Sequence, residues 1–85
     1  HKQHSLKFLY LGFNNLSEKL PSKLFENLNN LIHLDLNNSL IENLADKQFS
    51  NLFSLEYLNL GYNKLKTIKQ SQFKNLINLV ELDLR

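Results

Sequence analysis

The sequence repeats itself, and this repeat restricts the fold more than any other feature. The string L-x-x-L-x-L-x-x-N-x-L begins at Leu6 and again at Leu55. At Leu31 it recurs with Ser39 in the asparagine position, and a further copy begins at Leu79, so successive copies are offset by 25, 24 and 24 residues. A period of this length indicates a repeat architecture, in which each copy forms one structural unit.

Within each copy, the alternating L-x-L core predicts a short strand with one buried face. Successive strands should lie side by side in parallel, about 4.8 Å apart. The second half of each full copy carries F-x-N-L, and its phenylalanines should stack into an aromatic spine. These phenylalanines are Phe25, Phe49 and Phe73. The convex half of each unit should be filled by Leu44, Leu52, Ile68 and Leu76.

The asparagine position ends each strand, where a side-chain amide can satisfy backbone groups that no strand neighbour reaches. Asn14 and Asn63 should therefore form a ladder between units, with Ser39 as its middle step. Serine is too short to bridge two contacts, so a strained or water-filled step is expected near Ser39. A register shifted by one residue, with Asn38 and Leu40 in the pattern, is the alternative. One extra residue between Ser17 and Leu20 predicts a local bulge.

This pattern, over residues 6–85, resembles the leucine-rich-repeat family. The phenylalanine and the 24-residue length resemble the class typical of extracellular receptors, including Toll-like receptor ectodomains. The resemblance implies an α/β repeat solenoid, a right-handed superhelix with a parallel sheet on its concave face and an irregular or short-helical convex side.

The whole chain is interpreted as a single segment, with repeats at 6–30, 31–54 and 55–78 and a partial repeat at 79–85. A solenoid unit cannot bury its apolar faces without neighbours or caps. No cap pattern is visible at either end, so the segment is expected to be an uncapped part of a longer solenoid.

Residues between the strand leucines should face the concave surface and are the candidate binding residues. Four aromatic side chains stand among them, and aromatic side chains are favoured at protein interfaces. The alternative is that Phe13 and Tyr62 only pack over the strand ends. The predicted binding residues are Phe8, Tyr10, His33, Asp35, Tyr57, Asn59, Tyr62, Glu81 and Asp83.

Other chemistries find little support in the sequence. The pairs His33 with Asp35 and Glu81 with Asp83 lie on open strands that exclude no water, so no catalytic residue is predicted. His1 and His4 do not make a convincing metal site, and no cofactor is expected. The net charge is +2, and the lysines are interspersed with acids, which gives no strong nucleic-acid signal. No run is long enough to span a membrane.

Two sequons, Asn15-Leu16-Ser17 and Asn37-Asn38-Ser39, would accept N-linked glycans in a secretory pathway. Each also arises readily by chance in a chain with 13 asparagines.

These observations predict a non-enzymatic recognition segment that binds a protein ligand or co-receptor, with homo- or heterodimers as a further form of partner binding. The resemblance implies an extracellular or cell-surface ectodomain in innate-immune-type signalling. An intracellular scaffold or sensor, located in the cytoplasm, and a matrix or adhesion protein are the alternatives.

Overall fold

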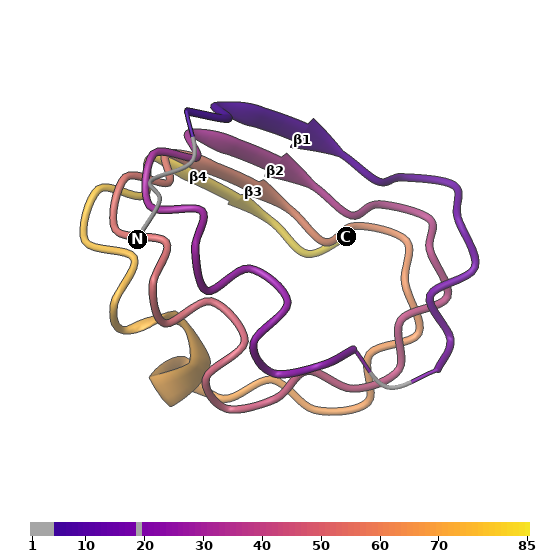
Figure 1. Ribbon diagram of the computed structural model, residues 1–85. Helices are drawn as coiled ribbons and strands as arrows, with labels where there is room; N and C mark the ends of the chain where they lie inside the picture. Colours follow the sequence, from indigo (N-terminus) through magenta and orange to yellow (C-terminus); the bar gives the residue numbers. More distant parts are fainter. Residues whose placement is uncertain (1–4, 19) are drawn as a thin grey trace.

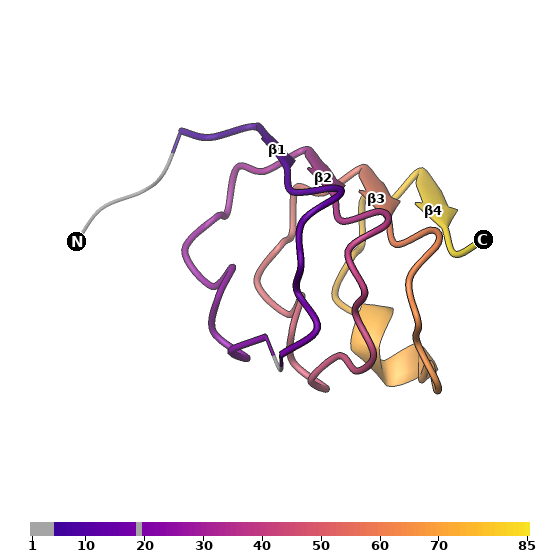
Figure 2. The same ribbon diagram turned by 90° about the vertical axis from the view of Figure 1, so that its right-hand side faces the viewer.

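The computed structural model describes residues 5–18 and 20–85, and it shows successive coils of chain stacked side by side (Figures 1 and 2). Each coil contributes one short strand to a single sheet. The strands are β1 (Phe8–Tyr10), β2 (His33–Asp35), β3 (Tyr57–Asn59) and β4 (Glu81–Asp83). They pair in parallel in the order β1-β2-β3-β4, which confirms the predicted solenoid with its parallel sheet.

The strand register follows the sequence repeat. Leu9 pairs with Leu34, Leu34 with Leu58 and Leu58 with Leu82, so the offsets between coils are those of the repeat. The structure takes the register that places Ser39 in the asparagine position, since Ser39 is fully buried whereas Leu40 is 40% exposed. The outward-facing residues of β1–β4, called the sheet face below, are the expected concave surface.

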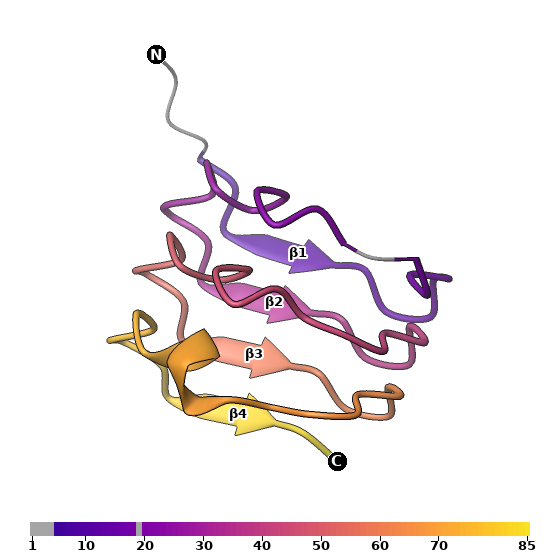
Figure 3. The same ribbon diagram turned by 90° about the horizontal axis from the view of Figure 1, so that it is seen from below.

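The side opposite the sheet is mostly irregular. Within the described residues, its single regular element is a short 3₁₀ helix, η1 (Gln70–Phe73), which lies across the solenoid from the strands (Figure 3). This arrangement agrees with the predicted irregular or short-helical convex side.

The core lies between the sheet and this opposite side, and the predicted aromatic spine is confirmed. The ring centroids of Phe25 and Phe49 are 6.2 Å apart, those of Phe49 and Phe73 are 6.1 Å apart, and both pairs are stacked. Phe49 is fully buried because rings lie on both of its sides. The stacked rings therefore join three consecutive coils.

One core prediction is wrong. Ile68 was expected to fill the convex half as Leu44 does, but Ile68 is 42% exposed whereas Leu44 is 9% exposed. The two side chains therefore differ in burial, although they occupy the same position of the repeat. Leu20 is buried at the place in the first coil that corresponds to Leu44. The expected bulge before Leu20 includes residue 19, which lies outside the described residues.

Candidate functional site

The sheet face consists of two columns of side chains that run across the strands. The parallel register aligns Phe8, His33, Tyr57 and Glu81 in the first column. It aligns Tyr10, Asp35, Asn59 and Asp83 in the second. All eight of these residues were predicted from the sequence, and the structure brings them together on one surface.

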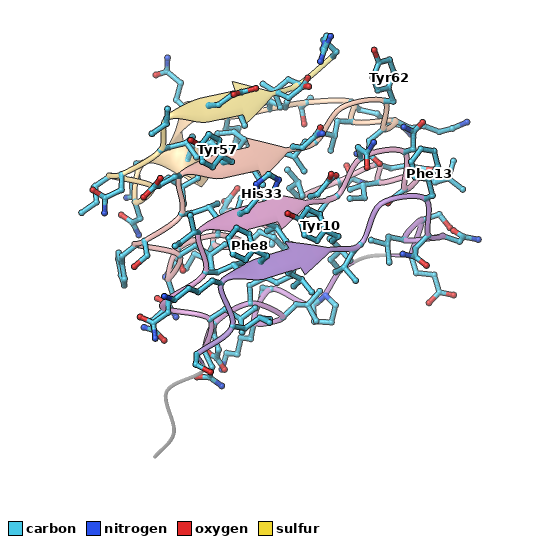
Figure 4. All side chains as sticks on the ribbon, turned by 90° about the horizontal axis from the view of Figure 1, so that it is seen from above. Phe8, Tyr10, Phe13, His33, Tyr57 and Tyr62 are labelled. Atoms are coloured by element: carbon cyan, nitrogen blue, oxygen red, sulfur yellow. The ribbon has the colours of Figure 1, made fainter. Side chains whose placement is uncertain are left out.

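Four rings of these columns form a cluster around His33, called the ring cluster below. The His33 ring centroid lies 6.4 Å from that of Phe8, 5.1 Å from that of Tyr10 and 5.5 Å from that of Tyr57. The outer rings remain open to solvent, with Phe8 54%, Tyr10 61% and Tyr57 37% exposed. The ring cluster therefore presents a continuous aromatic surface above β1–β3 (Figure 4).

The polar residues of the second column contribute to turn formation. Asp35 Oδ1 accepts the N–H of Asn37 at 2.9 Å, and Asn59 Oδ1 accepts the N–H of Gly61 at 2.8 Å. Asp and Asn side chains often bond to the backbone two residues later in this way. Tyr10 occupies the same position in the first coil, but its aromatic ring has no oxygen close enough to the backbone to accept such a bond. Asp35 and Asn59 therefore stabilise the turns that follow β2 and β3, in addition to lying on the sheet face.

Asp83 repeats this bond and adds an ion pair. Its Oδ1 accepts the N–H of Arg85 at 3.0 Å, and its Oδ2 lies 2.8 Å from Nη2 of the Arg85 guanidinium. These bonds from the side chain and backbone of Arg85 lower the pKa of Asp83 from 3.8 to about 2. Asp83 is consequently ionised and already paired within the chain.

Tyr62 and Phe13 lie apart from the ring cluster, in the turns that follow β3 and β1 (Figure 4). Both have left-handed backbones, with φ of 59° and 60°, and both are well exposed, at 60% and 78%. A bulky residue in this conformation is uncommon. Their rings therefore stand at the strand ends and do not extend the ring cluster.

Asn63 joins the second and third coils at the asparagine position. Its Oδ1 accepts the N–H groups of Ser39 at 2.8 Å and Ile41 at 3.1 Å. Its Nδ2 donates to the carbonyls of Leu36 at 2.8 Å and Leu60 at 3.0 Å. A single side chain thus satisfies backbone groups of two coils.

Ser39 connects the first and second coils through a different set of hydrogen bonds. Its Oγ lies 3.1 Å from the Leu11 carbonyl, which corresponds to the Leu36 carbonyl bound by Asn63. Serine has no second polar atom to accept the N–H of Leu16, and the Ser39 backbone carbonyl accepts it at 2.9 Å. Leu40 follows with a left-handed φ of 62°. Ser39 therefore connects the two coils through its hydroxyl and its backbone carbonyl, and the backbone is strained at Leu40.

Among the described residues, Asn14 bonds only within its own turn of the first coil. Its Nδ2 donates to the carbonyls of Leu11 at 2.9 Å and Gly12 at 3.2 Å, and the side chain is exposed. It therefore closes a turn within one coil, whereas Asn63 connects two coils.

A second ladder, on the side opposite the sheet, was not foreseen. Gln48 is 2% exposed, and its Nε2 donates to the Pro21 carbonyl at 2.7 Å. Gln72 is 6% exposed and donates to the Leu44 carbonyl at 3.0 Å. The repeat itself carries this signal, because each glutamine directly precedes a spine phenylalanine. Asn51, Asn75 and Asn78 add further bonds to carbonyls of the preceding coil.

The two sequons differ in their surroundings. Asn15 and Ser17 are both exposed, and the Ser17 N–H donates to Asn15 Oδ1 at 3.1 Å. Asn37 is partly buried, and its side-chain amide packs closely against Gly12 of the preceding coil. Asn15 is therefore the more accessible acceptor.

Within residues 5–18 and 20–85, no three His, Asp or Glu side chains are grouped in a way that would hold a metal ion. His1 and His4 lie outside the described residues. No helix in the described part of the chain has the length and apolarity needed to cross a bilayer.

The stacked coils, the parallel sheet and the inter-coil ladders together define a repeat-solenoid protein. The sequence matches the profile of the leucine rich repeat over residues 4–65 and again over residues 34–85, so the chain belongs to the leucine-rich-repeat family. Repeats of this family generally mediate protein binding and are typically non-enzymatic. A comparison with curated proteins finds no match to the chain.

Proposed function

We propose that this protein binds a protein partner through the ring cluster of its sheet face. The observation that carries the proposal is the exposure of Phe8, Tyr10 and Tyr57 around His33 on one rigid sheet. Solvated strand faces rarely hold three large aromatic side chains together without a partner, whereas interfaces are enriched in them. Parallel hydrogen bonding fixes the strands that carry the rings, so little backbone ordering entropy is lost on binding.

Site-specific crosslinking tests this surface. A photoreactive amino acid is placed at Tyr10 and, as a matched control, at Ile77, which is 75% exposed in the turn between η1 and β4. In the native setting, a defined protein should crosslink at position 10 and not at position 77. The partner identified by this crosslink should bind the Tyr10→Ser, Tyr57→Ser double variant, which carries no photoreactive group, much more weakly than it binds the unmodified protein. A partner whose affinity is the same for this double variant would contradict the proposal.

We further propose an extracellular, receptor-type role in immune-type signalling, similar to that of Toll-like ectodomains. The 24-residue spacing, the phenylalanine of each unit and the open sequon at Asn15 support it. The test is mass analysis of peptides from the native protein. An N-glycan on Asn15, with Asn37 unmodified, is the expected result. Unmodified asparagine at both positions would favour the cytoplasmic scaffold. If the protein bound only to copies of itself, the adhesion protein would be favoured.

A further inference from the structure

The strands carry charge of one sign only. Segments β1–β4 contain no lysine or arginine, but they hold the carboxylates of Asp35, Glu81 and Asp83. The chain as a whole has a net charge of +2, so its basic residues lie on other segments. A partner that meets the sheet face therefore meets negative charge beside the ring cluster, which favours a basic surface.

One of these carboxylates keeps its hydrogen-bonding atoms available for a partner, although Arg85 attracts it electrostatically. Asp83 is paired with Arg85, and Asp35 uses Oδ1 for the N–H of Asn37. The Glu81 carboxylate makes no hydrogen bond or ion pair within the described part of the chain, and the residue is exposed. Glu81 follows Tyr57 in the first column of the sheet face.

A shallow hollow of about 110 Å³ lies between these two residues and is lined by His33, Tyr57, Leu58, Asn59, Glu81 and Asp83. Its lining therefore combines aromatic residues with an acidic residue, Glu81, that forms no salt bridge within the described part of the chain. A guanidinium group stacks on aromatic faces and bonds carboxylates through its planar fork, and it is more weakly hydrated than an ammonium group. Arg85 already makes this type of bond with Asp83, through Nε at 3.2 Å and Nη2 at 2.8 Å.

We propose that this hollow receives an arginine side chain from a basic segment of the protein partner. The proposal rests on the proposed function and specifies its chemistry. Phe8 and Tyr10 lie on β1, two strands away from Tyr57, which corresponds to about 10 Å at the usual strand spacing. The partner segment thus presents an arginine to Tyr57 and Glu81 and an apolar side chain, about 10 Å away, to Phe8 and Tyr10.

The test is an NMR titration of the isotope-labelled protein with two small probes. The first probe is N-acetyl-arginine methylamide, and the second is the citrulline analogue, which has nearly the same shape and no charge. The arginine probe should shift the amide signals of Tyr57 and Glu81 in a saturable way, about two- to five-fold more tightly than the citrulline probe. Glu81→Gln should remove this preference, and added salt should reduce it.

The control variant is Glu26→Gln, which removes an exposed carboxylate from the side opposite the sheet and should leave the titration unchanged. Equal binding of the two probes, no binding of either, or an arginine preference that survives Glu81→Gln would overturn the inference. The proposed function is judged separately, since neither the crosslink from position 10 nor the weaker partner binding of the serine double variant requires an arginine.

Discussion

Replacing Asn63 by alanine should cost this protein much of its stability, although the position lies in a turn. The substitution removes the acceptor of the Ser39 and Ile41 N–H groups and the donor to the Leu36 and Leu60 carbonyls, at 2.8 to 3.1 Å. All four of those residues are at most 1% exposed, so water does not reach the groups in the folded coils.

The magnitude follows from these four bonds. A net contribution of about 1 kcal/mol each, reduced by local relaxation, gives a loss of about 2–4 kcal/mol. A domain of this size has a total unfolding free energy of roughly 4–13 kcal/mol. The midpoint of thermal unfolding should therefore fall by roughly 10 °C or more. Urea denaturation followed by circular dichroism measures the loss directly.

Asn14→Ala is the matched control, because it removes the same side chain from the same position of another coil. Asn14 is exposed and bonds only to carbonyls of its own turn, so the loss should stay below about 1 kcal/mol. Equal losses in the two variants would refute the reasoning, since they would show that bonds between coils add nothing to those within a coil.

The remaining predictions concern the spine, the strained turn and the terminal ion pair. Phe49→Ala should lower the unfolding free energy by about 3–5 kcal/mol, because Phe49 is fully buried. Phe53 is 44% exposed, so Phe53→Ala should lower it much less in the same denaturation assay. Leu40→Asn should raise the unfolding free energy by about 0.5 kcal/mol, because asparagine tolerates the left-handed backbone better than leucine does. A lower unfolding free energy in this variant would show that the backbone at Leu40 is not strained. Arg85→Gln should return the pKa of Asp83 from about 2 toward 3.8 in an NMR titration. Because the folded-state pKa is lowered, this pair stabilises the fold above pH 3.8 and loses its effect as the pH falls through about 2, where the variant and the parent should converge.

The fold was predictable from the sequence because one period fixes several features together. The spacing that aligns Leu34 with Leu58 also aligns Phe49 with Phe73 and brings the outward columns side by side. A strand of three residues would be a weak prediction by itself, but repetition at a constant offset leaves few other arrangements. The positions of the ring cluster followed from the same alternation.

The contacts of the polar residues were not predictable in the same way. The sequence does not distinguish a carboxylate that faces solvent from one that bends back to a backbone N–H, as that of Asp35 does. At Ser39 the missing acceptor is supplied by the backbone, with Leu40 in a left-handed conformation, and a residue pattern contains no such information. The buried Gln48 and Gln72 are different, since comparison of the repeats would have revealed them.

The distribution of these contacts explains how the sheet face can serve recognition. Coils are held together by the phenylalanine spine, by Asn63 and by the glutamines opposite the sheet, and within the described residues every buried polar side-chain atom has a partner. The rings of Tyr10 and Tyr57 contribute to none of these ladders. Substitution at either position should therefore change what the surface binds much more than how firmly the coils stack. Loss of the fold in the Tyr10→Ser, Tyr57→Ser double variant would show that recognition and stability are not separated in this way.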